Sequence, residues 1–508
     1  MNYSYTLALV ATGICSYICY FVWQTQKFRA LSHAHGCKLP PQYPHIDPIF
    51  GLDLFIRNAK AISQNRFLPD LQERYKKLGW TFGSLSFGSG AIASVEPENL
   101  RTIWVTKFED WGVQPLRLPA LAPFFPPSKY RKLEAVRRLF SAVSGTAAKR
   151  WLYRGSTNIL YKAPTLFLFG ESLGSLSGNK PPHSEGFLEA FQEGFSGTGM
   201  RIALGPLNFL LSKKKWLRAC ATSHRFADHY VQKALKYREQ FLAGKTDWGN
   251  SKASILLYNM AEQTGDPIYL RNQILQALMA AQETTANLLG NIFFLISRHP
   301  AVFQKLRAQV LSTAGDLDYN KLMGMKYLQN VINEALRLYP VLPQLNRHAL
   351  RDTILPVGGG PDGRSPIFVP FGTKFDTSFY VLHHLPNIWG PDVEEFRPER
   401  WDTMKPNAWE YVPFAGGPRV CAGQQKATIE ASYVVARMLQ EFEKVESRDD
   451  RPWWLPRVRL RMEPYIEDLP GLHVIFSTNH NLQGGIRESI RRILQNFREG
   501  KRIDHTYS

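Results

Sequence analysis

Cysteine is scarce in this chain, and its spacing fits neither disulfides nor zinc. Only five cysteines occur among 508 residues, and no two of them form a C-x-x-C pair. Cys15 and Cys19 lie in an apolar run near the N-terminus, and the other three are far apart in sequence. So few and so scattered thiols argue against a disulfide framework and against a structural zinc site. The chain therefore suits a reducing compartment.

Acidic residues are also in deficit, since 62 Lys and Arg face 43 Asp and Glu for a formal net charge of +19. A basic excess of this size points to an anionic partner such as a membrane surface or an acidic protein. No nucleic-acid-binding motif accompanies the charge, so we expect no nucleic-acid partner. A solvated basic surface without any such partner is the alternative. Low-complexity tracts and repeats are absent, and the composition is that of a globular protein.

Charge is missing altogether from Tyr5 to Gln24, a run of about the ~20 residues that a bilayer helix needs. Basic residues follow it at Lys27 and Arg29 and none precede it, an asymmetry that keeps the C-terminal flank in the cytosol. A cleaved signal peptide would need a basic start and a shorter core. A buried first helix of the main fold is the remaining alternative. We expect residues 1–24 to form a single membrane anchor.

The rest of the chain is predicted to be mainly α-helical with small β-sheets. Repeated prolines in residues 25–50 favour an extended connector. The pattern predicts a long buried helix over 266–299 and a second helix over 326–340, each closed by proline. Glycines and short apolar runs in 352–369 predict turns and strands.

The stretch "PFAGGPRVCAG", Pro413 to Gly423, surrounds one cysteine with glycines. Glycines at 416, 417 and 423 let the backbone turn tightly beside a large flat ligand. The helix-like run that follows places a Cys421 thiolate near a positive helix terminus, and Arg419 can bind a carboxylate with both arms of its guanidinium. A cysteine-ligated haem requires this combination of groups.

"FAGGPRVCAGQQKA" resembles the cytochrome P-450 signature Phe-x-Gly-Gly-x-Arg-x-Cys-x-Gly-x-x-x-Ala at every specified position. The resemblance implies a mainly α cytochrome P-450 fold with small β-sheets, preceded here by one transmembrane helix. It implies iron protoporphyrin IX with an axial thiolate from Cys421 as the metal ligand. It also implies that Phe414, Arg419 and Gly423 take part in cofactor binding, with Arg347 as a second contact to the haem propionates.

Two further motifs fit the same family. Glu334 and Arg337 in "EALR" lie one helical turn apart and can pair, and the resemblance implies that Arg400 in "FRPERW" joins them in a structural network. In "AAQETTA" the resemblance makes Thr284 and Glu283 the catalytic pair that delivers protons to dioxygen. A buried threonine that bonds back to its own helix carbonyl is the alternative for Thr284.

Longer stretches resemble the fungal branch that hydroxylates n-alkanes and fatty acids near the chain end. These are "YPHIDPIFGLDLF", "LPVGGGPDGRSPIFVPFGTKFDTSFYVLHH" and "GPDVEEFRPERW". The implied reaction inserts one oxygen atom from O2 into a C–H bond of a lipophilic substrate. Electrons come from NADPH through an NADPH-cytochrome reductase, whose acidic face suits this basic chain. The implied location is the endoplasmic reticulum membrane, with the catalytic domain in the cytosol and membrane lipid as a partner.

Two segments depart from the family. The helix with Trp-x-x-x-Arg, expected within residues 120–150, lacks its tryptophan, and neither Arg137 nor Arg138 can be assigned as a substitute. A haem-binding but catalytically impaired protein is therefore an alternative, as is a secondary-metabolism monooxygenase acting on a terpenoid or polyketide. The catalytic domain is predicted to span 51–477. Residues 478–508 form a basic extension that either lies on anionic lipid as an amphipathic helix or is simply solvated.

Overall fold

The computed structural model describes residues 26, 30–113, 120–124, 167–171, 182, 184–246, 255–313, 315–447 and 474–477. The chain divides into two compact units, each formed by segments that are far apart in sequence. Unit 1 comprises Met1–Pro115, Leu342–Pro391 and Pro406–Val420, and unit 2 comprises Leu116–Val341, Asp392–Lys405 and Cys421–Ser508.

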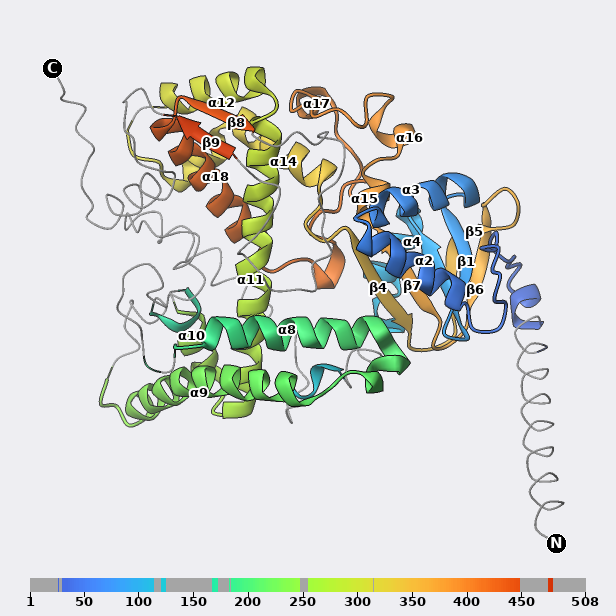
Figure 1. The fold of residues 1–508 in the computed structure, drawn as a ribbon, viewed down its shortest axis with the longest axis horizontal. Helices are drawn as coiled ribbons and strands as arrows, with labels where there is room; N and C mark the ends of the chain where they lie inside the picture. The colour runs from blue at the N-terminus through green and yellow to red at the C-terminus, as the bar shows by residue number, and fades with distance from the viewer. Residues whose placement is uncertain are drawn as a thin grey trace, which may run out of the picture. The chain divides into compact units, whose positions relative to one another are not determined.

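Unit 1 is built on a five-stranded sheet with the strand order β1-β2-β7-β4-β3 (Figure 1). The β1–β2 hairpin is antiparallel, β2 pairs with β7 in parallel, and β4 pairs antiparallel with both β7 and β3. This mixed order brings strands from opposite halves of the chain into one sheet. The strands are β1 (Thr81–Ser86), β2 (Ser89–Ser94), β3 (Trp111–Gly112), β4 (Gln344–Ala349) and β7 (Lys374–Ser378).

A second hairpin of unit 1 joins β5 (Thr353–Gly359) to β6 (Ser365–Val369), which confirms the strands predicted for residues 352–369. The pairing changes register between Leu355 and Gly359. A Cβ atom on Gly359 would lie 2.5 Å from the carbonyl oxygen of Lys38, so only glycine fits there. The glycine run therefore lets the hairpin pack closely against the preceding chain.

The segment before β1 also lies against the unit 1 sheet. Gly83 N–H donates to the Pro41 carbonyl at 2.8 Å, and Tyr43 N–H donates to the Gly83 carbonyl at 2.8 Å. These bonds satisfy backbone groups of β1 on its otherwise open edge. The helices of unit 1 are α2 (Leu52–Ser63), α3 (Phe67–Leu78), α4 (Pro97–Arg101), η1 (Thr102–Thr106), η2 (Phe108–Asp110), α15 (Phe379–Leu382), α16 (Pro386–Trp389) and η4 (Gly417–Arg419).

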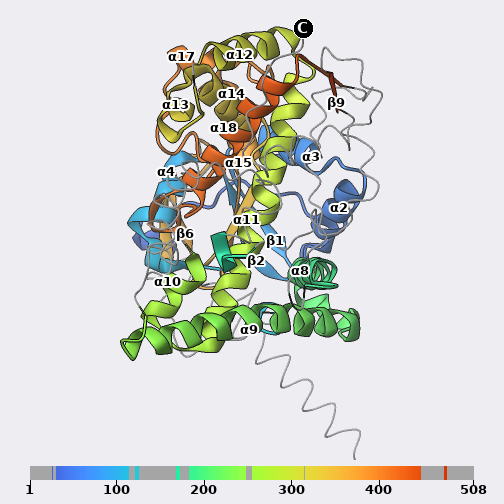
Figure 2. The ribbon, with the colours of Figure 1, turned by 90° about the vertical axis from the view of Figure 1, so that its left-hand side faces the viewer.

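Unit 2 is organised around α11 (Pro267–Ile296), which confirms the long helix predicted for residues 266–299. Asp266 caps it, since its carboxylate accepts from the backbone N–H groups of Ile268 at 2.9 Å and Tyr269 at 3.1 Å. Figures 1 and 2 show two helix groups in unit 2, one at each end of α11. The group at the N-terminal end is α8 (Phe187–Leu204), α9 (Lys214–Leu242) and α10 (Leu256–Gln263), with η3 (Gly205–Leu210) between α8 and α9.

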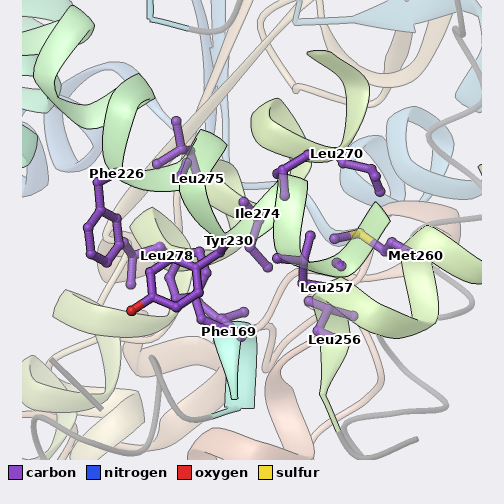
Figure 3. Close-up of a cluster of buried hydrophobic side chains, with 14 of the residues drawn as sticks. Phe169, Phe226, Tyr230, Leu256, Leu257, Met260, Leu270, Ile274, Leu275 and Leu278 are labelled. Atoms are coloured by element: carbon purple, nitrogen blue, oxygen red, sulfur yellow. The ribbon is translucent and has the colours of Figure 1, made fainter. Parts of the chain in front are cut away.

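A buried hydrophobic cluster joins α9 and α10 to the N-terminal half of α11 (Figure 3). Leu256, Leu257, Leu270 and Ile274 are fully buried within it. Burial of each such side chain contributes about 1.5–3 kcal/mol. Helix α8 joins the same cluster, because Phe187 stacks on Phe226 with ring centroids 3.7 Å apart. The apolar residues in the N-terminal half of α11 thus form part of the hydrophobic core shared with α8, α9 and α10.

The other end of α11 carries the remaining helices of unit 2 and a two-stranded sheet. The second predicted helix, over 326–340, is confirmed as α14. The sheet pairs β8 with β9, which ends at Ser477. The elements are α12 (Pro300–Ser312), α13 (Tyr319–Gly324), α14 (Lys326–Leu338), α17 (Arg400–Thr403), α18 (Gln424–Glu441), β8 (Lys444–Ser447) and β9 (Val474–Ser477).

The described part of the chain is therefore mainly helical with small sheets, as expected from the sequence. Within the described ranges, no helix has both the length and the apolar character needed to cross a bilayer. The predicted anchor over 1–24 and the predicted extension over 478–508 lie outside the described residues.

Candidate functional site

The glycine-rich loop before Cys421 contains left-handed backbone at a glycine, Gly417, and at a residue that is not glycine, Ala415. Gly417 has φ +63°, and a Cβ atom there would lie 2.1 Å from the Trp104 carbonyl oxygen. Ala415 also adopts a left-handed conformation, with φ 57°, which costs an L-residue about 1–2 kcal/mol. Gly423 has φ −89°, so a left-handed turn is not the reason for glycine there. The tight approach of the backbone comes from Gly417.

Cys421 is a free thiol that is exposed in the structure. Gly423 caps α18, so the cysteine directly precedes the N-terminus of that helix. Desolvation by the surrounding protein raises the pKa of the thiol, while hydrogen bonds from the backbone N–H groups of Gly423 and Gln424 act to lower this pKa. A thiol that reaches solvent and has N–H donors close to its sulfur suits a thiolate metal ligand.

Two arginines of unit 1 are held by aromatic rings and backbone carbonyls. Arg419 donates from Nη1 to the Trp111 carbonyl at 2.8 Å, and its guanidinium lies 4.5 Å from the Phe108 ring centroid. Arg347 on β4 is 6% exposed, and its guanidinium lies 4.6 Å from the centroid of Trp104. Arg419 precedes Cys421 by two positions, so their Cα atoms are at most about 7 Å apart.

Sequence reasoning missed the two tryptophans beside these arginines. Trp104 in η1 is 2% exposed and Trp111 in β3 is fully buried. Their rings both meet the ring of Phe375 edge to face, with centroid distances of 6.4 Å and 5.7 Å. Nothing in "IWVTKFEDWG" marks either residue, because their contacts come from strands β4 and β7 far along the chain.

In unit 2 the structure brings together the three side chains predicted to form a network. The carboxylate of Glu334 accepts from Arg337 Nε at 3.0 Å and Nη2 at 2.9 Å, and from Arg400 Nε at 3.3 Å. Glu334 and Arg337 are completely buried and the Arg400 side chain is 2% exposed. Buried charges are stable only when paired and hydrogen-bonded, and each of these is.

Three further partners complete this network, and none of them was predicted. Trp401 Nε1 donates to Glu334 at 3.0 Å. Asp392 accepts from Arg400 Nη1 at 2.9 Å, and hydrogen bonds to Asp392 lower the pKa of its carboxyl group, with Arg400 as the main cause. Arg337 Nη1 donates to the Val393 carbonyl at 2.8 Å. The network thus fastens the loop before α17 to helix α14.

Thr284 lies on α11, which packs against α18, the helix that follows Cys421. Its Oγ1 donates to the carbonyl of Ala280 one turn earlier at 2.7 Å. The hydroxyl therefore has the back-bonded geometry that is usual for threonine in a helix, while its lone pairs stay available as acceptors. Phe414 is half-buried. The side chain of Glu283 and most of residues 120–150 lie outside what the structure describes.

A family model for cytochrome P450 matches residues 117–460. The chain belongs to the cytochrome P450 family. It is 34% identical to the cytochrome P450 monooxygenase himC of Aspergillus japonicus over 82% of this chain and 80% of the relative. It is 33% identical to the cytochrome P450 monooxygenase FPY7 of Fusarium mangiferae over 88% and 91%, and 34% identical to cytochrome P450 52A13 of Debaryomyces hansenii over 82% and 88%.

This P450 is accordingly an oxidoreductase of the monooxygenase class, with haem-thiolate as its cofactor and NADPH as the electron source through a reductase. The described residues fit that cofactor. Cys421 in unit 2 offers an accessible soft ligand. In unit 1, Gly417 allows close backbone approach, and Arg347 and Arg419 carry guanidinium groups of the kind that bind carboxylates.

The Glu334 network yields a stability prediction. Glu334→Gln leaves Arg337 and Arg400 buried with a neutral partner, and removing one member of a buried ion pair costs about 3–5 kcal/mol. We expect denaturant unfolding of the haem-loaded protein to show a loss of that size, with haem released at a lower denaturant concentration.

Glu399→Gln is the matched control. Glu399 pairs with Lys305 at 2.6 Å in a contact whose side chains are 40% and 54% exposed, and an exposed pair contributes about 0–1 kcal/mol. Equal losses in the two variants would mean that the buried network has no special role in stability.

Proposed function

We propose that this P450 hydroxylates a long-chain fatty acid or an n-alkane at or near the chain end. The supporting observation is the "GGGPDG" turn of the β5–β6 hairpin, Gly358 to Gly363, within stretches that resemble the fungal alkane and fatty-acid branch. Its glycines are needed where they stand: Gly358 has φ +106°, and a Cβ atom there would lie 2.6 Å from Thr81 Cγ2. The turn is therefore packed against strand β1 of unit 1 in a way that requires glycine at position 358.

Haem supplies the oxidising chemistry when it is bound, and the protein side chains supply the ligand, the anion contacts and the protons. In this proposal Cys421 is the thiolate ligand, Arg347 and Arg419 hold the haem carboxylates, and Glu283 passes protons to Thr284. The Oγ1 proton of Thr284 is engaged with the Ala280 carbonyl in the structure. Its release from that bond makes it available to dioxygen.

Turnover tests the proposed substrate. The full chain with its reductase partner and NADPH is given palmitic acid, hexadecane or a terpenoid at equal concentration, and oxygenated products are identified by mass spectrometry. We expect hydroxylation of the palmitic acid or hexadecane chain within its last few carbons. Terpenoid oxidation alone would favour a secondary-metabolism enzyme, and haem binding without any product would favour an impaired one.

The role of Thr284 is tested by Thr284→Ala. Transfer of a proton by a positioned group contributes about 10²–10⁴-fold in rate, so we expect product per NADPH to fall about ten-fold or more while NADPH consumption continues. The lost product should reappear as hydrogen peroxide, counted in the same reaction.

Thr285→Ala is the control, because Thr285 is the adjacent threonine on the same helix and is 9% exposed. It should keep the wild-type ratio of product to NADPH. A wild-type ratio in Thr284→Ala would assign the hydroxyl to the helix backbone alone.

We also propose that residues 1–24 anchor the protein in the endoplasmic reticulum membrane as a single span, with the catalytic domain in the cytosol. The uncharged run Tyr5 to Gln24 and the basic residues after it support this location. An NADPH-cytochrome reductase with an acidic face is the partner that the net charge of +19 favours.

Deletion of residues 1–24 tests the anchor. The shortened chain should move largely from the membrane pellet to the soluble fraction and keep the ferrous carbon monoxide absorption near ~450 nm that marks thiolate ligation. Loss of that absorption would instead place the segment within the haem-binding fold.

A further inference from the structure

We propose that His45 is a pH-sensitive latch at the edge of the unit 1 sheet. The neutral imidazole holds the backbone of β1, and the protonated imidazole releases β1 while it stays bound to Asp53. The latch therefore fastens the end of the proline-rich connector to the sheet at neutral pH and frees it in acid. The inference lies within unit 1 and is independent of the proposed substrate and of the proposed membrane anchor.

The first observation concerns the way in which the chain before α2 covers the open edge of β1. Two of its contacts are ordinary backbone bonds, from Gly83 N–H to the Pro41 carbonyl and from Tyr43 N–H to the Gly83 carbonyl. The next β1 donor on this edge is Leu85 N–H, which donates to Nε2 of His45 at 2.8 Å. An imidazole therefore stands where an edge strand ordinarily meets a main-chain acceptor.

The second observation is that Asp53 fixes the position of the imidazole proton. Nδ1 of His45 lies 2.8 Å from Oδ1 of Asp53, and Oδ2 accepts from Ile46 N–H at 3.1 Å. The side chains of His45 and Asp53 are only 7% and 15% exposed. Desolvation acts to raise the pKa of the Asp53 carboxyl group, but hydrogen bonds from His45 and the backbone lower this pKa overall, so the group is an ionised acceptor.

The two partners together define one neutral form of the ring. Leu85 N–H can only donate, so Nε2 of His45 must offer its lone pair, and the ring proton must lie on Nδ1, where it is donated to Asp53. A second proton can then bind only at Nε2. It would point at Leu85 N–H, and two donors cannot form a hydrogen bond.

Protonation thus breaks one contact of His45 and strengthens the other, because an imidazolium and a carboxylate attract each other. The contact with Leu85 is present when the ring is neutral, at the higher pH, and is lost as the pH falls and the ring gains its second proton. The contact with Asp53 persists on both sides of this change. The direction of the response is therefore set by geometry.

The other charged and titratable groups around the imidazole do not oppose this response. The ring of Tyr43 packs edge to face on the imidazole with centroids 4.7 Å apart, and its hydroxyl accepts from Arg57 at 3.4 Å. Arg57 is paired with Asp70 at 2.6 Å, which offsets its charge. Asp47, in the turn before α2, interacts electrostatically with Asp53 and adds negative charge to this side. Negative charge favours the protonated ring.

Release of Leu85 loosens the turn between His45 and α2. Gly51 in this turn has φ +68°, and a Cβ atom there would lie 2.5 Å from the Leu85 carbonyl oxygen, so the turn packs directly on the residue that the latch holds. The turn displays Ile46 and Ile49, which are 91% and 68% exposed. Acid therefore frees an apolar turn from the sheet, at the place where the connector enters the catalytic domain.

The experiment measures amide hydrogen exchange at Leu85 in the full-length, haem-loaded protein, with single-residue resolution from electron-transfer fragmentation. Exchange is compared at about pH 8 and about pH 5, which bracket the range in which histidine side chains ordinarily titrate. After correction for the intrinsic exchange rate, we expect protection of Leu85 to fall about five-fold or more at the lower pH, as one hydrogen bond is lost. Equal protection at both pH values would overturn the proposal.

His45→Gln removes the titration but keeps a side-chain oxygen that can accept from Leu85 N–H. This variant should show the same protection of Leu85 at both pH values. His224→Gln is the matched control, because Nε2 of His224 lies 2.8 Å from the Phe124 carbonyl and donates whether or not the ring is charged. It should keep the wild-type response. A response that persists in His45→Gln would also overturn the proposal.

The tautomer gives a test that does not depend on how the glutamine variant folds. Nitrogen NMR of the histidine rings in the wild-type holoprotein at about pH 8 distinguishes a proton on Nδ1 from a proton on Nε2. The His45 signals are those that are absent from His45→Asn. We expect the proton on Nδ1. A neutral ring with its proton on Nε2 could not accept from Leu85 N–H, and the latch assignment would then be wrong.

Discussion

The buried carboxylate of Glu334 is the group on which the packing of α14 and α17 in unit 2 depends. It is completely buried and binds two arginines and a tryptophan from two separate segments of unit 2. Such a carboxylate is unfavourable in a protein interior unless every partner is in place. Satisfying the Glu334 carboxylate therefore holds the loop before α17 against helix α14.

A second constraint acts in unit 1, where aromatic rings and strands β3, β4 and β7 position the cations. Arg347 and Arg419 each contact a tryptophan through the ring or the backbone carbonyl. Gly417 permits the loop to approach Trp104, and the strain at Ala415 shows that the loop is held in an unfavourable backbone conformation. The rigid aromatic support explains how such a loop keeps its shape.

The class of reaction and the choice of substrate depend on different parts of the molecule. Cys421, Arg419 and the Glu334 network follow from one short signature and two motifs, and the family match agrees with the oxidoreductase class that they imply. The substrate depends on side chains that line a binding pocket, and those follow no comparable motif. For this reason the proposal of a fatty acid or alkane rests on the hairpin from Gly358 to Gly363, and turnover is the measurement that tests it.

The sequence alone determined the features that local chemistry controls. The long helix α11 follows from its apolar run and from the prolines at 267 and 300, and α14 follows from a helical run that Pro340 ends. The pairing of Glu334 with Arg337 follows from helical spacing. The short strands of residues 352–369 follow from glycines that flank apolar residues.

Only the tertiary structure decided which distant segments meet. Trp104 and Trp111 both contact Phe375, and Trp104 also contacts Arg347, so these contacts join segments more than 200 residues apart in the printed sequence. The parallel pairing of β2 with β7 and the antiparallel pairing of β3 with β4 span similar separations. Local propensity carries no information on such pairings, because they are selected by burial of whole faces and by the satisfaction of backbone groups. The hydrogen bond of Thr284 to Ala280 is local, but the sequence offered it only as one of two alternatives, because a helical threonine can also turn its hydroxyl to another partner.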